Sequence, residues 1–424
     1  MKKIFYCIFI IMFMLSCEHT ADLQIMKTAE QKISTLRSVD DAERIAMDAL
    51  HKFPAHAQTK SQTRTISEIN VITSVATKAT NQDTLMYAVN FENSNGFALI
   101  AADPEKPAVL ALTYKGRYDG NETDCPAFNF YMDGLKEALT YDANISRGGI
   151  VEDLFYYELD TTSFMRAKFP EIESIWHQEA PFNRYCINNN GYTCPAGCGA
   201  VAIAHAISRY ATTSKINLSF SNAPQDSLTI DLDAWKTHQF IHSNICDVCN
   251  NNALWIREIG EQCNMSYTPN GSSTNIFNTR NCLTHFGYSS QITVGYNINS
   301  IINSLDHNKT VIMIGDNDNG AGHAWNTDGY LYHEQTINCY MVTNNSPLKQ
   351  DVGFETTQNW YLNFIFGTKY GDYDGYFIAW SRFIGEGWRF YEPIDEVTIS
   401  MFQSHPDTQF VNDIELLTDI APNN

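Results

Sequence analysis

The amino-acid sequence predicts an α+β fold divided between two units. Residues 87–114 contain three strand-like runs, and a helical stretch at residues 129–141 follows them, which together describe a small mixed unit. From Ile175 onward the chain is richer in Trp, Cys, Asn and Gly and alternates between strand and helix patterns. The 424 residues are 44% hydrophobic and only 18% charged, which suits two or three packed domains and excludes a disordered or coiled-coil protein.

The first 17 residues have the pattern of an export signal. A basic start precedes the apolar run 4–15, which is too short to span a bilayer. The following Ser16 and Cys17 resemble the end of a bacterial lipoprotein cleavage box, although Met14 stands where the strongest form has Leu. We therefore expect residues 1–17 to be a lipoprotein signal, with Cys17 lipidated and the protein at the outer membrane or cell surface, or released. An ordinary secretory cleavage nearby and a cysteine of the apolar run are the alternatives.

The first unit should contain helices and strands in a simple order. Ser38 and Asp41 precede an apolar stripe at helical spacing, which predicts a capped helix. The expected elements are a helix at 42–50, a short strand within 69–75, a hairpin of 87–91 and 96–101, a strand at 109–114 and a helix at 129–141. A hinge is expected near 147–149 or 166–168. The boundary is placed between residues 165 and 166, so that the units are 18–165 and 166–424.

Charge and cysteine usage exclude several classes of function. The chain has 28 basic and 48 acidic residues, a net charge of −20, and nucleic-acid binding needs the opposite. Nine cysteines lie beyond Cys7 and Cys17, an odd number that leaves at least one unpaired. Cys246 and Cys249 form a single CxxC, a zinc half-site, a redox pair or, most simply, buried or locally bridged thiols. No metal and no organic cofactor are expected.

Cys198 has the surroundings of a nucleophile. It directly precedes the small-residue apolar stretch 201–207, so its thiol should lie at the N-terminus of a buried helix. There the free amides and the helix dipole favour the thiolate, and a backbone N–H can bind an oxyanion. The alternative is a disulfide-bonded cysteine that opens a core helix.

His323 is the candidate base for that nucleophile. It lies between Gly322 and Ala324, and a strand-like run follows. The predicted strand 310–314 leads into the Gly-rich turn before it, so we expect His323 at a strand edge that borders a cleft.

Several motifs in the same order resemble those of the streptopain family of bacterial cysteine proteases. In the second unit they are 176–183 (WHQEAPFN), 197–200 (GCGA), 253–260 (ALWIREIG), Tyr267, 271–272 (GS) and 322–330 (GHAWNTDGY). In the first unit, 87–91, 96–102 and 107–111 resemble strands of the family's pro-domain. The resemblance covers residues 30–380.

The resemblance implies a papain-like fold preceded by a small α+β pro-domain that inhibits the enzyme. A helical part would carry Cys198 and a β-sheet part His323, with the cleft for a protein or peptide substrate between them. Gln178 would join the Cys198 amide in binding the oxyanion, and Asn363 would orient His323. The implied partners are peptide substrates and the protein's own pro-domain, with membrane contact only through the lipid anchor. The residues assigned to substrate binding or shielding are Gly322, Trp325 and Phe364.

Two departures from the family pattern bear on activity. Gly199 replaces Val after the nucleophile, which is tolerable because only its amide faces the oxyanion. In the segment 363–367 (NFIFG) the family has Asn-Trp-Gly-Trp-Gly, and residues 334–360 contain an insertion that leaves Asn344 and Asn345 as rival orienting residues. The alternatives are therefore a catalytically impaired pseudoenzyme that acts as a surface binding lipoprotein, and an unrelated binding module with Cys198 in a disulfide.

Overall fold

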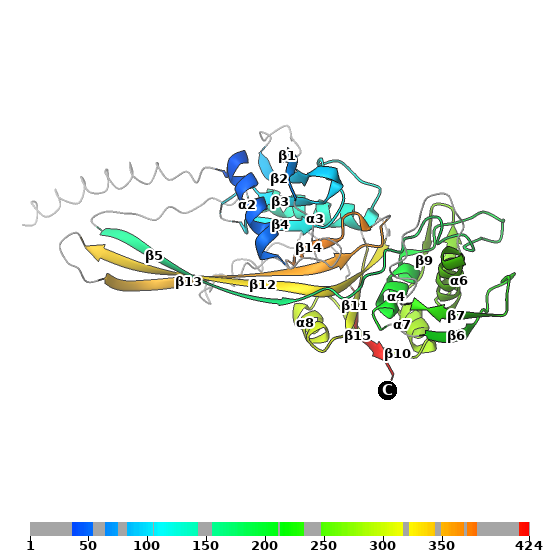
Figure 1. The fold of residues 1–424 in the computed structure, drawn as a ribbon. Helices are drawn as coiled ribbons and strands as arrows, with labels where there is room; N and C mark the ends of the chain where they lie inside the picture. The colour runs from blue at the N-terminus through cyan, green and yellow to red at the C-terminus, as the bar shows by residue number, and fades with distance from the viewer. Residues whose placement is uncertain are drawn as a thin grey trace, which may run out of the picture.

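The computed structural model describes 11 stretches of the chain (Figure 1). They are residues 36–53, 64–74, 83–104, 106–142, 155–210, 213–232, 247–316, 322–343, 349–368, 371–379 and 415–423. The predicted signal with Cys17, the first cysteine of the CxxC and the rivals Asn344 and Asn345 lie outside these stretches. Within them, no helix combines the length and apolar character needed to cross a membrane.

The capped helix of the first unit is confirmed as α2 (Val39–Lys52). Ser38 is its N-cap, and a capping box joins it to Asp41, because each residue's side chain accepts the other's backbone N–H. The alanines Ala42, Ala46 and Ala49 are buried along one face. This face covers the sheet formed by the next strands (Figure 1).

That sheet is antiparallel, in the order β1-β2-β3-β4. Its strands are β1 (Ile66–Thr73), β2 (Thr84–Phe91), β3 (Phe97–Ala101) and β4 (Val109–Thr113), and the helix α3 (Pro126–Asp142) follows. The β2–β3 turn contains Asn93 and Ser94 at positive φ, in keeping with the predicted polar hairpin turn. Side chains on β2, β3 and β4 are almost all buried, so this sheet is covered on both faces.

The first unit and the second share one eleven-stranded sheet. Strand β4 pairs antiparallel with β14 (Gly375–Ile378), which joins Thr113 to Gly375 and Ala111 to Phe377. The sheet then continues through β13 (Lys349–Ile365), β12 (Gly322–Thr343), β11 (Thr310–Asp316), β15 (Glu415–Pro422) and β10 (Tyr288–Val294). Docking of the two units therefore rests on backbone pairing as well as on side-chain packing.

The predicted insertion 334–360 forms much of a long ribbon. Strand β5 (Phe155–Lys168) pairs with β12 along its whole length, and β12 also pairs with β13, so three strands extend away from the body (Figure 1). The predicted boundary at 165 and 166 falls inside β5. This strand is hydrogen-bonded to β12 of the second unit, so the ribbon crosses that boundary without a break in pairing.

The helical part of the second unit packs around one central helix, α4 (Cys198–Ser208). Residues 199–208 of α4 are all buried, in a core with α6 (Asp247–Gln262) and α7 (Ile276–His285). Small strand pairs lie beside them, and α8 (Ile298–Asp306) lies against the sheet. The pairs are β6 (Thr213–Asn217) with β7 (Ser227–Asp231), and β8 (Ser266–Thr268) with β9 (Gly271–Ser273).

Candidate active site

Cys198 is the first residue of α4, as the sequence predicts. The residue before it, Gly197, has φ 93°, a left-handed conformation that favours glycine. A Cβ at Gly197 would lie 2.6 Å from the sulfur of Met265, so the turn also needs the missing side chain. Conformation and packing together fix where the Cys198 thiol leaves the helix.

The Cys198 thiol lies against the strand that carries His323. The thiol is half-buried and free of disulfide bonds. Burial raises its pKa, and hydrogen bonds from the backbone N–H of Ala324, of Gly199 and of Cys198 itself oppose that rise. Because Ala324 directly follows His323, the structure brings the two predicted catalytic motifs together. Among the described residues, no hydrogen bond joins the Cys198 thiol to the His323 ring.

The contact between α4 and β12 is held by a second bond. The Asn326 side chain of β12 donates to the backbone carbonyl of Ala202 in α4 at 3.0 Å, and both residues are buried. The helix that begins with Cys198 and the strand that carries His323 are thus fixed to each other inside the core.

His323 is the second residue of β12 and is only 8% exposed. Its Nε2 atom lies 3.5 Å from the carbonyl oxygen of Phe366. Burial lowers the pKa of His323 to about 4, and the Phe366 carbonyl partly opposes this. A neutral ring with its Nε2–H on a carbonyl keeps Nδ1 as an acceptor, which is the form a general base needs.

The structure does not bring Asn363 to His323. Asn363 is buried, its Nδ2 donates to Asp328 Oδ1 at 2.8 Å, and its Oδ1 accepts the Tyr114 hydroxyl at 2.7 Å. It pairs with Gly329 on β12, six positions along the chain from His323, and both polar atoms of its carboxamide are bonded to other residues. The group on His323 Nε2 is instead the Phe366 carbonyl, which sequence reasoning missed although Phe366 lies in the same motif.

Two of the predicted shielding residues, Phe364 and Trp325, belong to one buried aromatic cluster. Their ring centroids are 6.0 Å apart, and Phe366 lies 5.7 Å from Phe364 and 6.3 Å from Trp325. These three buried rings lie around the Phe366 peptide and exclude water from that peptide. Gly322, the third, is exposed at the start of β12.

Gln178 lies beside the loop that leads to the nucleophile. Its backbone carbonyl accepts the N–H of Ala196 at 2.8 Å, and its side chain is half-buried. The preceding residues are held on α4 by His205, whose Nε2 lies 3.0 Å from the Trp176 carbonyl and whose Nδ1 lies 2.6 Å from Ser174 Oγ. This network sets the path of the segment that presents Gln178.

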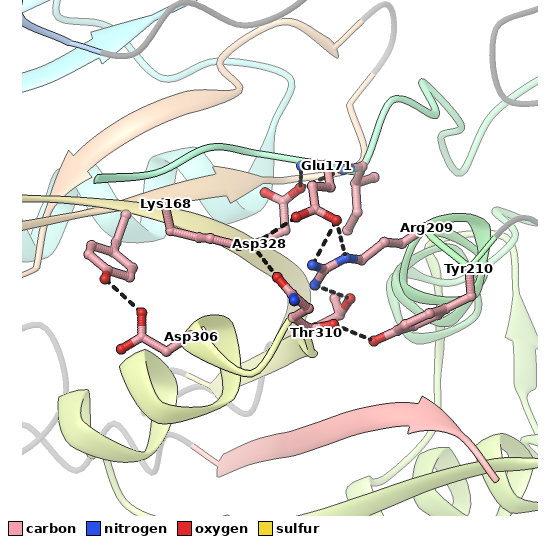
Figure 2. Close-up of polar contacts among 10 residues, drawn as sticks. Lys168, Glu171, Arg209, Tyr210, Asp306, Thr310 and Asp328 are labelled. Carbon is pink, nitrogen blue, oxygen red and sulfur yellow. Dashed lines mark hydrogen bonds and ion pairs between the residues drawn. The ribbon is translucent and has the colours of Figure 1, made fainter. Parts of the chain in front are cut away.

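Asp328 is buried, and the sequence assigned it no role. Its Oδ2 accepts the backbone N–H of Glu171 at 2.7 Å and of Ile172 at 2.6 Å. Burial raises the pKa of Asp328, and these N–H groups and the Asn363 amide oppose the rise. Glu171 also forms an ion pair with Arg209 at 2.8 Å (Figure 2). Asp328 therefore fixes the chain where it leaves β5 and enters the second unit.

The cysteines of the described residues are mostly free thiols. Apart from Cys198, the free ones are Cys125, Cys186, Cys194, Cys263 and Cys282, all buried. Cys249 is disulfide-bonded. A free Cys198 disagrees with the alternative in which this residue opens a core helix as half of a disulfide. No group of three or more His, Cys, Asp or Glu side chains in the described stretches could hold a metal ion.

Comparison with known protein families identifies a domain in each unit. Residues 176–377 match the model of the Peptidase C10 family, and residues 30–139 match that of the Spi protease inhibitor. No curated protein sequence matches the chain.

Two solved structures from Prevotella intermedia are similar to this chain. One is a prointerpain A fragment with a cysteine-to-alanine mutation, with TM-score 0.50 and 15% identity over 84% of this chain and 100% of that chain. The other is active wild-type interpain A cysteine protease, with TM-score 0.34 and 18% identity over 50% of this chain and 85% of that chain. The first likeness shows a shared fold and confirms the predicted papain-like α+β architecture with a preceding pro-domain. This chain therefore contains a Peptidase C10, or streptopain-family, domain at residues 176–377 and an inhibitor-like pro-domain of the Spi type at residues 30–139.

Proposed function

We propose that this protein is an exported, surface-anchored cysteine endopeptidase that is made as a zymogen, with Cys198 as its nucleophile and His323 as its base. The observation that carries the proposal is the position of the Cys198 thiol, at the N-terminus of α4 and on the backbone N–H of Ala324. Two sequence motifs more than 100 residues apart supply a thiol and an imidazole at one place in a buried contact.

The proposed reaction follows from these positions. His323 Nδ1 takes the proton of the Cys198 thiol, and the thiolate attacks the carbonyl carbon of a peptide bond. The oxyanion is bound by the Cys198 N–H and by Gln178, and each such donor typically lowers the barrier by about 3 kcal/mol. His323 then gives the proton to the leaving amine, and water cleaves the thioester to release the acid and restore the thiol.

The proposal includes control by the pro-domain. Strand β4 of the pro-domain adds to β14, and Tyr114 reaches across to the buried Asn363 of β13. These contacts support inhibition in cis until the chain is cut between the units. A fragment from about residue 166 onward should hydrolyse casein, and adding a separate fragment of residues 21–150 should suppress that hydrolysis.

Export and anchoring through Cys17 are part of the same proposal and rest on the sequence of residues 1–17. Cells that express the full chain should incorporate a labelled fatty acid into it, and Cys17→Ser should abolish the labelling. Labelling that persists in Cys17→Ser would remove the anchor from the proposal.

The deciding experiment uses a thiol-directed epoxide on the full chain and on variants. Cys198→Ala should abolish epoxide labelling, self-processing and peptide hydrolysis, while Cys194→Ala should retain all three. Cys194 is a control because it is also a free thiol and lies in the loop that leads to Cys198, but is buried. An active Cys198→Ala protein would overturn the assignment.

A second candidate is a pseudoenzyme that keeps the fold for binding at the surface. The observation that favours it is the engagement of Asn363 by Asp328 and Tyr114, which leaves no carboxamide of the described stretches on His323. A folded wild-type chain whose Cys198 neither reacts with the epoxide nor cleaves peptides would support this candidate.

A further inference from the structure

Asp374 directly precedes β14, and the proposed reaction does not use it. Its Oδ1 accepts the backbone N–H of Phe366 at 2.8 Å. The carbonyl of the same residue, Phe366, lies 3.5 Å from His323 Nε2. One residue therefore connects a carboxylate on one side to the catalytic imidazole on the other.

The position of Phe366 is constrained from a third direction. The next residue, Gly367, has φ 67°, and a Cβ there would lie 2.9 Å from a methyl group of Val201 in α4. The turn after β13 is thus pressed against the helix of the nucleophile. Within this turn, the N–H of Phe366 points to Asp374 and its carbonyl lies beside His323.

We propose that Asp374 is a positioning residue for His323. Asp374 acts through Phe366 and holds the imidazole with Nε2–H toward the Phe366 carbonyl and Nδ1 toward the Cys198 thiol. The inference rests on the proposed function for the role of His323 as base. It assigns to a carboxylate and a backbone carbonyl the orienting work that the sequence assigned to Asn363. The physical basis is that the partner on one ring nitrogen of a neutral histidine determines which nitrogen carries the proton.

The charge of Asp374 should change the strength of this hold near neutral pH. Burial raises the pKa of Asp374 to about 7, and the Phe366 N–H opposes the rise. Other charged and titratable groups face it from neighbouring segments: Asp372 and Asp328 raise the pKa, Lys115 lowers it, and Tyr114 and Cys125 interact with the carboxylate. An ionised acceptor forms a shorter and stronger bond to an N–H than a neutral one, so the hold is tighter above that pH.

The pro-domain docks on the backbone of this same residue. The Tyr114 N–H donates to the Asp374 carbonyl at 2.9 Å, next to the pairing of β4 with β14. The bond from Phe366 to the Asp374 carboxylate lies wholly within the catalytic region. Removal of the pro-domain therefore leaves both partners of this bond in place, while it takes away Lys115, Tyr114 and Cys125, which act on the carboxylate in the zymogen.

The first test is spectroscopic and needs no activity. It uses the full-length chain with Cys198→Ala, which cannot process itself, and follows the Phe366 amide and the His323 ring nitrogens by NMR from pH 5.5 to 8.5, with His323→Ala for assignment. We expect both signals to follow one titration near pH 7. Adding Asp374→Asn should abolish that titration in both signals. The control Asp372→Asn should keep the titration but shift its midpoint to lower pH, because it removes a neighbouring negative charge. If the Phe366 amide signal titrates near pH 7 and the signals of the His323 ring nitrogens do not change with it, the proposal is wrong.

The second test measures kinetics in chains that have their active thiol. Asp374→Asn should lower kcat for a peptide substrate at pH 8 by about tenfold to a hundredfold, less than the roughly 10⁴-fold loss when a carboxylate directly on a catalytic histidine is replaced. KM should stay within about twofold, because no substrate contact is removed. At pH 6 the kcat of the variant and that of the wild type should be similar, since the side chain at position 374 is then uncharged in both proteins.

The two tests separate the possible failures. A wild-type chain that never hydrolyses peptides while its His323 follows the Asp374 titration would count against the proposed function and for the positioning. A loss of rate in Asp374→Asn that is equal at pH 6 and pH 8, or confined to KM, would contradict the positioning. Asp372→Asn should change kcat by no more than about twofold at pH 8, where Asp374 is ionised with or without it, and a melting temperature for each variant controls for misfolding.

Discussion

Replacing Asn363 by Ala distinguishes the orienting role expected from the sequence from the structural role seen in the fold. The sequence pattern predicts that Asn363→Ala lowers turnover by on the order of tenfold to a thousandfold with little change in melting temperature, by analogy with loss of a triad's orienting group. The structure predicts a different result. Asn363 is fully buried and both atoms of its carboxamide are used, one by Asp328 and one by Tyr114.

The size of the effect follows from what the substitution leaves behind. Asp328 Oδ1 loses its donor and the Tyr114 hydroxyl loses its acceptor, both inside the core. A buried polar group without a partner costs about 1–3 kcal/mol, so the two together should lower the free energy of unfolding by about 2–6 kcal/mol. For a domain of 150–250 residues each kcal/mol shifts the melting temperature by about 2–4 °C, which gives a loss of roughly 4–24 °C. The pKa of Asp328 should also rise further, because the Asn363 bond is one of the groups that lower it.

The assay is thermal and urea unfolding of full-length chains that carry Cys198→Ala, so that self-cleavage cannot occur. A double-mutant cycle with Tyr114→Phe isolates the contact between the units, and we expect a coupling free energy of about 0.5–3 kcal/mol for groups in direct contact. Turnover is measured separately in chains with the thiol intact, at a temperature where each variant is folded.

One outcome would refute the structural argument. If Asn363→Ala keeps its melting temperature within about 1 °C while its turnover falls more than about tenfold, the buried network contributes little to stability. Asn363 would then have to act on His323 after a rearrangement of the β12 and β13 strands.

Three further predictions concern the site and the pH dependence of the full chain. His323→Ala should lose turnover to the same extent as Cys198→Ala, since members of a catalytic unit are not additive; a retained rate in either would remove that assignment. Gly197→Ala should destabilise the fold by about 1–3 kcal/mol, because the new methyl strains a left-handed residue and overlaps Met265, and chemical denaturation measures this loss. An ordinary carboxyl group has a pKa of about 4, and burial raises the pKa of Asp374 to about 7 in the folded chain. Between these two values Asp374 is protonated in the folded chain and ionised in the unfolded chain. The contribution of Asp374 to stability is therefore present at low pH and is lost as the pH rises through this window. Melting temperatures at pH 5 and pH 8 should differ less in Asp374→Asn, and an unchanged difference would contradict the shift.

Much of the fold could be predicted because it is decided locally. The capping pair Ser38 and Asp41 determines where α2 begins, and the apolar spacing after it determines which face is buried. The small residues after Cys198 form a helix that can pack deeply on all sides, and α4 begins at the predicted residue. The order of the motifs along the chain was enough to indicate the family, which the matches to residues 176–377 and 30–139 confirm.

The sequence by itself thus determined the two-unit α+β architecture and the placement of Cys198 at a helix start and of His323 on a strand. It could not decide the partners of the buried polar groups, because these depend on strand register and on contacts between distant segments. Tyr114 and Asn363 are 249 residues apart, and the pairing of β12 with β13 shifts by one residue between Thr327 and Gly329. A one-residue shift moves side chains to the opposite face of a sheet. Only the tertiary structure therefore placed Asn363 on Asp328 and put the Phe366 carbonyl, which Asp374 holds through the Phe366 N–H, next to His323.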